Sequence, residues 1–125
     1  MKYKREEPFR YVFPEPIDAE FTFKQLDSEA TSNKGKASII DINPNGVKFS
    51  SHLDLPVRDE RILFYITFLI KNKQISIPGN ITWKKNYLNR YIYGFNAQNT
   101  QEKQEEIIKE IKEYAKSLRS NKAFK

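Results

Sequence analysis

The sequence predicts a mainly β fold, a six-stranded antiparallel β-barrel followed by a C-terminal α-helix. Three observations support this prediction. Six segments alternate apolar and polar residues and are joined by short polar connections, which is the pattern of an antiparallel barrel. Aromatic residues make up 14% of the chain, and aromatic side chains favour strands. The final segment changes to helical spacing of its apolar residues, so we expect it to form one amphipathic helix.

Each expected strand shows the period-two alternation of a half-buried strand or carries apolar residues on both faces. The strongest signal is the fourth segment, in which apolar residues line both sides. A bulge or sharp bend is expected at Pro78-Gly79, because proline and glycine interrupt a strand and a closing barrel needs such bends. The six expected strands cover residues 17–24, 37–42, 47–50, 61–71, 74–83 and 90–96.

The turn between the second and third strands has a specific turn chemistry. Pro44 presets φ for the first turn residue, Asn45 tolerates unusual backbone angles, and Gly46 can adopt a positive φ. These residues predict a three-residue hairpin, a type I turn closed by a glycine bulge. The turn is expected to hold the side chains of Asp41 and Asn43 at one rim of the sheet.

The two ends of the chain differ from the barrel between them. We expect an extended, arginine-bearing arm over residues 1–16, because its three prolines discourage a helix. The barrel is expected over 17–98 and the helix over 99–119, all within one domain. Asn99 is the expected N-cap, with Glu102 three residues later. The helix should pack on the barrel; a dimer or partner interface is the alternative. Its apolar stripe consists of Ile107, Ile108, Ile111, Tyr114, Ala115 and Leu118.

The composition argues against several classes of function. The chain has no cysteine and one histidine, His52, which is expected to be a surface residue. There is no glycine-rich phosphate loop and no His/Cys spacing for a metal, so we expect neither an enzyme nor a cofactor or metal. The net charge of +6 suits an anionic ligand or partner, although excess lysine also aids solubility. No signal peptide or membrane-spanning run is predicted, and a cytoplasmic location is expected.

The candidate binding residues come from the arm and the turn. Arg5 and Arg10 carry guanidinium groups, which bind phosphates, donate to guanine O6 and N7, and stack on bases. Asp41 and Asn43 supply a carboxylate and an amide that could meet a guanine Watson–Crick edge. Gly46 allows close approach of the backbone.

These motifs resemble those of the PilZ domain family, in which an arginine pair precedes a barrel and an Asp/Asn-x-Ser-x-x-Gly turn follows. Here the turn reads Asp-x-Asn-x-x-Gly over 41–46, Gly79 to Trp83 resembles the fifth-strand stretch of the family, and Tyr93-Gly94-Phe95 resembles its closing strand. The resemblance implies a PilZ-type barrel that binds cyclic di-GMP, a bacterial second messenger, and signals to an unidentified protein partner. The nucleotide-binding residues it implies are Arg5, Arg10, Asp41, Asn43, Gly46 and Trp83.

Two departures from the family pattern support an alternative. The arginines are spaced Arg-x-x-x-x-Arg, so Glu6 stands where the first arginine is expected, and Asn43 replaces the family serine. The alternative is a degenerate PilZ protein that does not bind the nucleotide and acts as a protein–protein adaptor. A nucleic-acid-binding barrel is disfavoured because acidic residues interrupt any basic face. Both a monomer and a homodimer fit the helix stripe.

Overall fold

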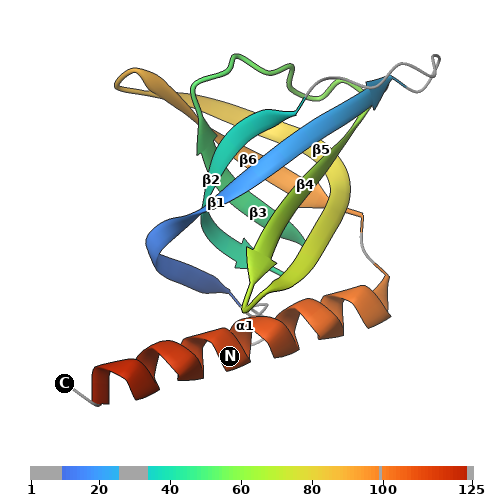
Figure 1. Cartoon of the computed structure of the whole chain (residues 1–125). Coiled ribbons are helices and arrows are strands. Elements are labelled where there is room, and N and C mark those ends of the chain that lie inside the picture. Colours follow the sequence, from blue (N-terminus) through green and yellow to red (C-terminus); the bar gives the residue numbers. More distant parts are fainter. Residues whose placement is uncertain (1–9, 26–33, 99, 124–125) are drawn as a thin grey trace, which may run out of the picture.

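The protein is described by a computed structural model that covers residues 10–25, 34–98 and 100–123. Six antiparallel strands close into a barrel in the order β1-β2-β3-β6-β5-β4, and α1 lies across one end of it (Figure 1). This architecture confirms the predicted fold class. The elements are β1 Tyr11–Gln25, β2 Gly35–Asn43, β3 Gly46–Ser51, β4 Ile62–Ile70, β5 Lys73–Tyr87, β6 Arg90–Ala97 and α1 Gln101–Ala123.

The inward faces of the strands form one hydrophobic core of isoleucine and phenylalanine side chains. The core also includes Tyr93, whose ring is fully buried and stacks on Phe49 with the ring centroids 5.1 Å apart. The Tyr93 hydroxyl donates to the carbonyl of Leu53 and accepts from the backbone N–H of Leu55 at 2.8 Å. The connector between β3 and β4 is thereby fixed to the core. Burial raises the pKa of the Tyr93 phenol above its ordinary value.

Strand β1 begins at Tyr11, earlier than the expected start at Ile17, so the predicted boundary between arm and barrel at 16/17 differs from the structure. Its first residues pair with β2, and the pairing is interrupted between Val12 and Ile17. Pro14 and Pro16 fall inside this interruption, where the ladder needs no N–H donor. The prolines therefore distort the strand without ending it.

Two local predictions in the hairpins are wrong. Gly46 does not adopt a positive φ; it pairs with Asn43, so the hairpin loop has two residues and lacks the expected glycine bulge. The ladder of β5 is regular through Pro78 and Gly79, and its bulge falls instead between Ile81 and Trp83. Pro78 pairs with Tyr65 of β4, and on the β6 side its carbonyl accepts a hydrogen bond from the Gln98 N–H at 2.8 Å.

Helix α1 covers the end of the barrel. Its cap is Thr100 rather than the expected Asn99, which lies outside the described residues: the Lys103 N–H donates to Thr100 Oγ1 at 3.1 Å. Ile107 and Ile111 are fully buried against the barrel, so the stripe packs inward as predicted. The Tyr114 ring packs edge-on against Phe13, with centroids 5.8 Å apart.

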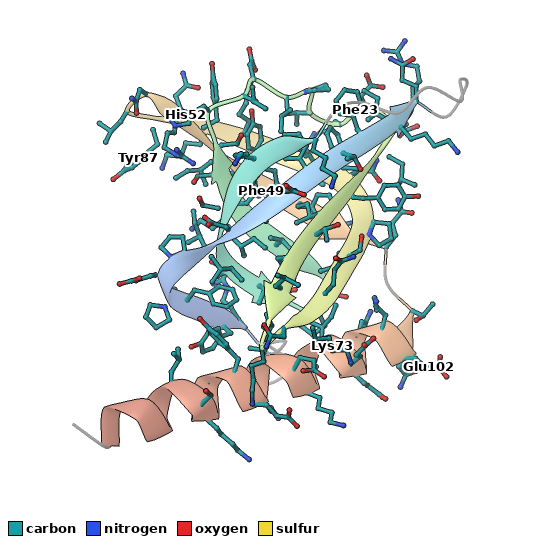
Figure 2. All side chains as sticks on the ribbon, in the orientation of Figure 1. Phe23, Phe49, His52, Lys73, Tyr87 and Glu102 are labelled. Atoms are coloured by element: carbon teal, nitrogen blue, oxygen red, sulfur yellow. The ribbon has the colours of Figure 1, made fainter. Side chains whose placement is uncertain are left out.

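Ion pairs tie the helix to the β4–β5 turn. Lys73, labelled beside the helix in Figure 2, lies 2.9 Å from Glu106 Oε2 and 3.1 Å from Glu110 Oε2. Hydrogen bonds to these carboxylates raise the pKa of Lys73, and the same contact lowers the pKa of Glu106. Lys73 and Glu106 are exposed and Glu110 is partly buried, so we expect these pairs to orient the helix more than they stabilise it.

Candidate functional site

A row of four residues crosses the outer face of the barrel. Asp41 on β2 pairs with Lys48 on β3, Lys48 pairs with Gly94 on β6, and Gly94 pairs with Trp83 on β5. Residues that face each other in neighbouring strands project from the same side of the sheet. The row therefore brings a carboxylate, an ammonium group and an indole ring together from four strands.

Two β-bulges turn the ends of this row outward. In β2 the register shifts between Ile39 and Asp41, and in β5 it shifts between Ile81 and Trp83. Ile39 and Ile81 are buried in the core, so regular alternation would point Asp41 and Trp83 inward as well. A bulge adds one residue and moves the following side chain to the other face. The site therefore depends on both bulges.

Arg10 extends the row beyond Asp41. It directly precedes Tyr11, which pairs with Ile42, so the ladder holds Arg10 beside the site. Arg10 Nε lies 3.8 Å from Asp41 Oδ1. The Asp41 residue is only 6% exposed, and a carboxylate so far removed from water needs a nearby cation. Arg10 is exposed and supplies that cation while its remaining N–H groups stay accessible.

Trp83 is positioned by the absence of a side chain at Gly94. A Cβ at Gly94 would lie 2.0 Å from Trp83 Nε1, so the indole lies directly against the glycine backbone. Trp83 is nevertheless 42% exposed, which leaves part of its ring available. The bulge next to it is held by Arg58, whose N–H donates to the Ile81 carbonyl at 2.8 Å and whose Nε donates to the Thr82 carbonyl at 3.0 Å.

The β2–β3 turn forms the rim next to the row. Asn43 Oδ1 accepts a hydrogen bond from the Asn45 N–H at 2.7 Å, so its amide Nδ2–H₂ group is the part that can donate to a ligand. Gly46 is required for packing, because a Cβ there would lie 2.6 Å from the Phe95 carbonyl oxygen. The sequence predicted a glycine requirement at 46 from a positive φ, whereas the structure requires glycine there because of the Phe95 backbone.

Together these residues surround an open hollow of about 210 Å³. Arg10 and Lys48 bring positive charge to it, Asp41 brings negative charge, and Trp83 brings an aromatic surface. Such a set suits a flat, polar, anionic ligand. The hollow is lined by Arg10, Asp41, Asn43, Gly46, Val47, Lys48, Thr82, Trp83, Gly94, Phe95 and Asn96.

The structure brings together five of the six residues predicted from sequence, namely Arg10, Asp41, Asn43, Gly46 and Trp83. Arg5 lies outside the described residues. Sequence reasoning missed Lys48, which looks like any outward lysine on a strand. Its position two residues after Gly46 is the signal that could have indicated it, since that position faces Asp41 across the hairpin.

The sequence also raised the questions of His52, a metal site and a membrane-spanning helix. His52 is exposed, and its Nε2 lies 2.7 Å from Arg90 Nη1 at the barrel end away from α1. Within residues 10–25, 34–98 and 100–123, no group of His, Asp or Glu side chains could hold a metal ion. The same residues include no helix with the length and apolar character needed to cross a membrane.

The fold and this outer hollow define a small β-barrel with a strand–turn–strand site beside the start of its first strand. The family model of the PilZ domain matches residues 3–114, and the chain belongs to this family. No curated protein gives a significant match to the sequence.

Two solved structures share the fold. The PilZ domain of YcgR from Escherichia coli, with c-di-GMP, aligns with a TM-score of 0.63 at 12% identity over 96% of this chain and 98% of the other. YcgR of Escherichia coli in complex with c-di-GMP aligns with a TM-score of 0.61 at 13% identity over 94% of this chain and 50% of the other.

Proposed function

We propose that this protein is a non-catalytic receptor that binds cyclic di-GMP in the hollow on the outer face of the barrel. The observation that carries the proposal is the grouping of Arg10, Asp41, Lys48 and Trp83 around one hollow. Membership of the PilZ family and the c-di-GMP named for the two YcgR structures support it.

Each side chain has a chemical counterpart in the ligand. Cyclic di-GMP carries two phosphates and two guanines. The Asp41 carboxylate can accept from the N1–H and N2–H groups of a guanine, and Arg10 can donate to guanine O6 and N7 or to a phosphate. Lys48 is placed as a point charge for a phosphate. Trp83 offers a face on which a base can stack.

The size of the hollow supports a role in binding for the segment before β1. About 210 Å³ is less than the roughly 300–1,000 Å³ of pockets that enclose a small ligand, so the barrel surface holds only part of the dinucleotide. The N-terminal segment, which includes Arg5, directly precedes Arg10 in the chain. We infer that this segment closes over the ligand and supplies the second arginine.

We propose that signalling to a partner runs through the packing at the start of β1. Tyr11, the residue after Arg10, contacts the Tyr114 ring of α1 with centroids 6.3 Å apart, and Phe13 contacts the same ring. These contacts support a route by which a change at Arg10 would reach the helix through one layer of aromatic rings. Hydrogen exchange should slow around Tyr11 and Tyr114 when cyclic di-GMP is added, and unchanged exchange at Tyr114 would exclude this route.

Calorimetric titration with cyclic di-GMP tests the binding proposal. Loss of one charge-assisted contact costs about 1.5–3 kcal/mol, so Arg10→Ala should weaken binding roughly 10- to 150-fold. Arg61→Ala is the matched control, because it removes the same charge from an exposed arginine that pairs with Asp59 outside the hollow. Equal affinity of the two variants would refute the proposed site.

The degenerate adaptor is the alternative that this titration separates from the receptor. It predicts no heat with cyclic di-GMP at any practical protein concentration. Replacing Asn43 by Ser, the family residue, then provides a second test. The Asn43 Oδ1 already accepts a hydrogen bond from the Asn45 N–H in the turn, and a serine hydroxyl can accept the same bond. Recovery of binding in Asn43→Ser would therefore show that Asn43 is the cause of the lost affinity.

A further inference from the structure

The β5–β6 hairpin projects from the barrel end away from α1 (Figure 1), and the residues at its tip are apolar and exposed. Its two loop residues are Leu88 and Asn89, and Leu88 is 89% exposed. Tyr87 before it is 55% exposed. A leucine this exposed makes almost no contact with its own protein, so packing does not account for it.

The backbone conformation at position 88 also disfavours leucine. Leu88 has φ of 56°, a left-handed conformation, whereas Asn89 is not among the residues of positive φ. One positive φ at the first loop residue is the pattern of a type II′ turn, in which glycine is preferred. Leucine is disfavoured there on conformational grounds as well as by its exposure. An outlier of this kind indicates a function outside the fold.

Positive charges flank the apolar tip on both strands of the hairpin. Lys84 and Lys85 precede it and Arg90 follows it, with no acidic residue between positions 83 and 91. Lys84 is paired with Asp54, but Arg90 contacts His52 and Ser50 rather than a carboxylate. Figure 2 places His52 and Tyr87 at the same end of the barrel.

A second exposed leucine belongs to the same end. Leu53, 47% exposed, follows His52, and its carbonyl is held by the Tyr93 hydroxyl. The connector and the hairpin are thus fixed to each other through the core residue Tyr93 and through the contact between His52 and Arg90. This end of the barrel therefore presents leucine and tyrosine side chains on a rigid support, with Lys85 and Arg90 beside them and Asp54 paired with Lys84.

We propose that this hairpin tip inserts into the surface of an anionic lipid bilayer. A stable protein interface buries about 800 Å² on each partner, far more than a two-residue tip provides. A bilayer needs no matching pocket. Leu88 would enter the acyl boundary, Tyr87 would lie at headgroup level, and Lys85 and Arg90 would contact anionic headgroups. This proposal does not depend on nucleotide binding.

Sedimentation of the 125-residue chain with vesicles of phosphatidylglycerol and phosphatidylcholine, in the absence of nucleotide, tests the proposal. We expect binding to these vesicles and much weaker binding to pure phosphatidylcholine. Raising the salt concentration should weaken it. Lys85→Ala should reduce binding about fivefold, because that is the effect on affinity of losing one lysine near an anionic membrane surface. Equal binding to the two kinds of vesicle would overturn the proposal.

Leu88→Asn separates lipid binding from stability. Asparagine tolerates a positive φ better than leucine, so the variant should unfold at the same temperature as the parent or higher. Its partition onto anionic vesicles should nevertheless fall at least about tenfold. Leu69→Thr is the matched control, because Leu69 is also exposed but lies on the outer face of β4.

Two further results would overturn the proposal. One is vesicle binding by Leu88→Asn at the parental level. The other is concentration-dependent dimerisation of the parent, abolished by Leu88→Asn, without vesicle binding; this would assign the tip to a second copy of the chain. Loss of vesicle binding in Leu88→Asn, with Leu69→Thr unchanged and cyclic di-GMP affinity unchanged, would support it.

Discussion

Replacing Gly94 by alanine is the sharpest test of how the site is built. The new Cβ would lie 2.0, 2.3 and 2.5 Å from three atoms of the Trp83 indole. Carbon atoms in good contact are about 3.5 Å apart, so the ring must move by roughly 1.5 Å. Because Trp83 is partly exposed, it can move outward into solvent instead of forcing the strands apart. The variant should therefore fold with a displaced indole.

The expected magnitudes follow from two separate losses. Overpacking at Gly94 should lower the free energy of unfolding by about 1–3 kcal/mol. Base–aromatic stacking contributes about 1–3 kcal/mol per base, so the affinity for cyclic di-GMP should fall roughly 5- to 150-fold if Trp83 is the stacking surface. The second effect is specific to the site.

Fluorescence gives a direct assay, because Trp83 is the single tryptophan of the chain. Gly94→Ala should shift its emission to longer wavelength and reduce the response to cyclic di-GMP. Gly35→Ala is the control: its Cβ would meet the Phe21 ring at 2.5 Å, so it should cost stability without changing Trp83 emission or affinity. Unchanged emission and affinity in Gly94→Ala would refute the placement of the indole.

Three further predictions concern stability. Tyr93→Phe should lower the free energy of unfolding by about 1–3 kcal/mol in urea titrations, because the Leu55 N–H loses its buried acceptor. Since the folded-state pKa of Tyr93 is raised above its unfolded value near 10, the protein should lose stability as the pH rises above about 10, and thermal melts of Tyr93→Phe should show a smaller loss. Ile111→Ala should lower the free energy of unfolding by about 2–5 kcal/mol; a cost below 1 kcal/mol would contradict the packing of α1 on the barrel.

The sequence predicts the six strands, the helix and most of the site because these leave a periodic or motif-like signal. The bulges leave none: Ile81, Thr82 and Trp83 read as ordinary alternation, and only the pairing with β6 shows the extra residue. Pro78-Gly79 gives a strong local signal that the regular ladder with β4 overrides. Lys48 is recognisable only through its cross-strand neighbour Asp41. Local chemistry is readable from the chain, whereas register is decided by the partners of each strand.

The part of β5 that extends beyond its pairing with β4 has a consequence for solubility. A ring of strands has no free edge, but the described part of β4 pairs with β5 only as far as Gly79, and Arg58 covers β5 at Ile81 and Thr82. Among the residues that the structure describes, no strand pairs with β5 on this side from Trp83 onward, so a strand of another molecule could add there. Lys84 and Lys85 stand on this edge, and charged lysines there discourage sheet extension and aggregation. We therefore expect Lys84 and Lys85 to limit edge-to-edge association of the projecting hairpin.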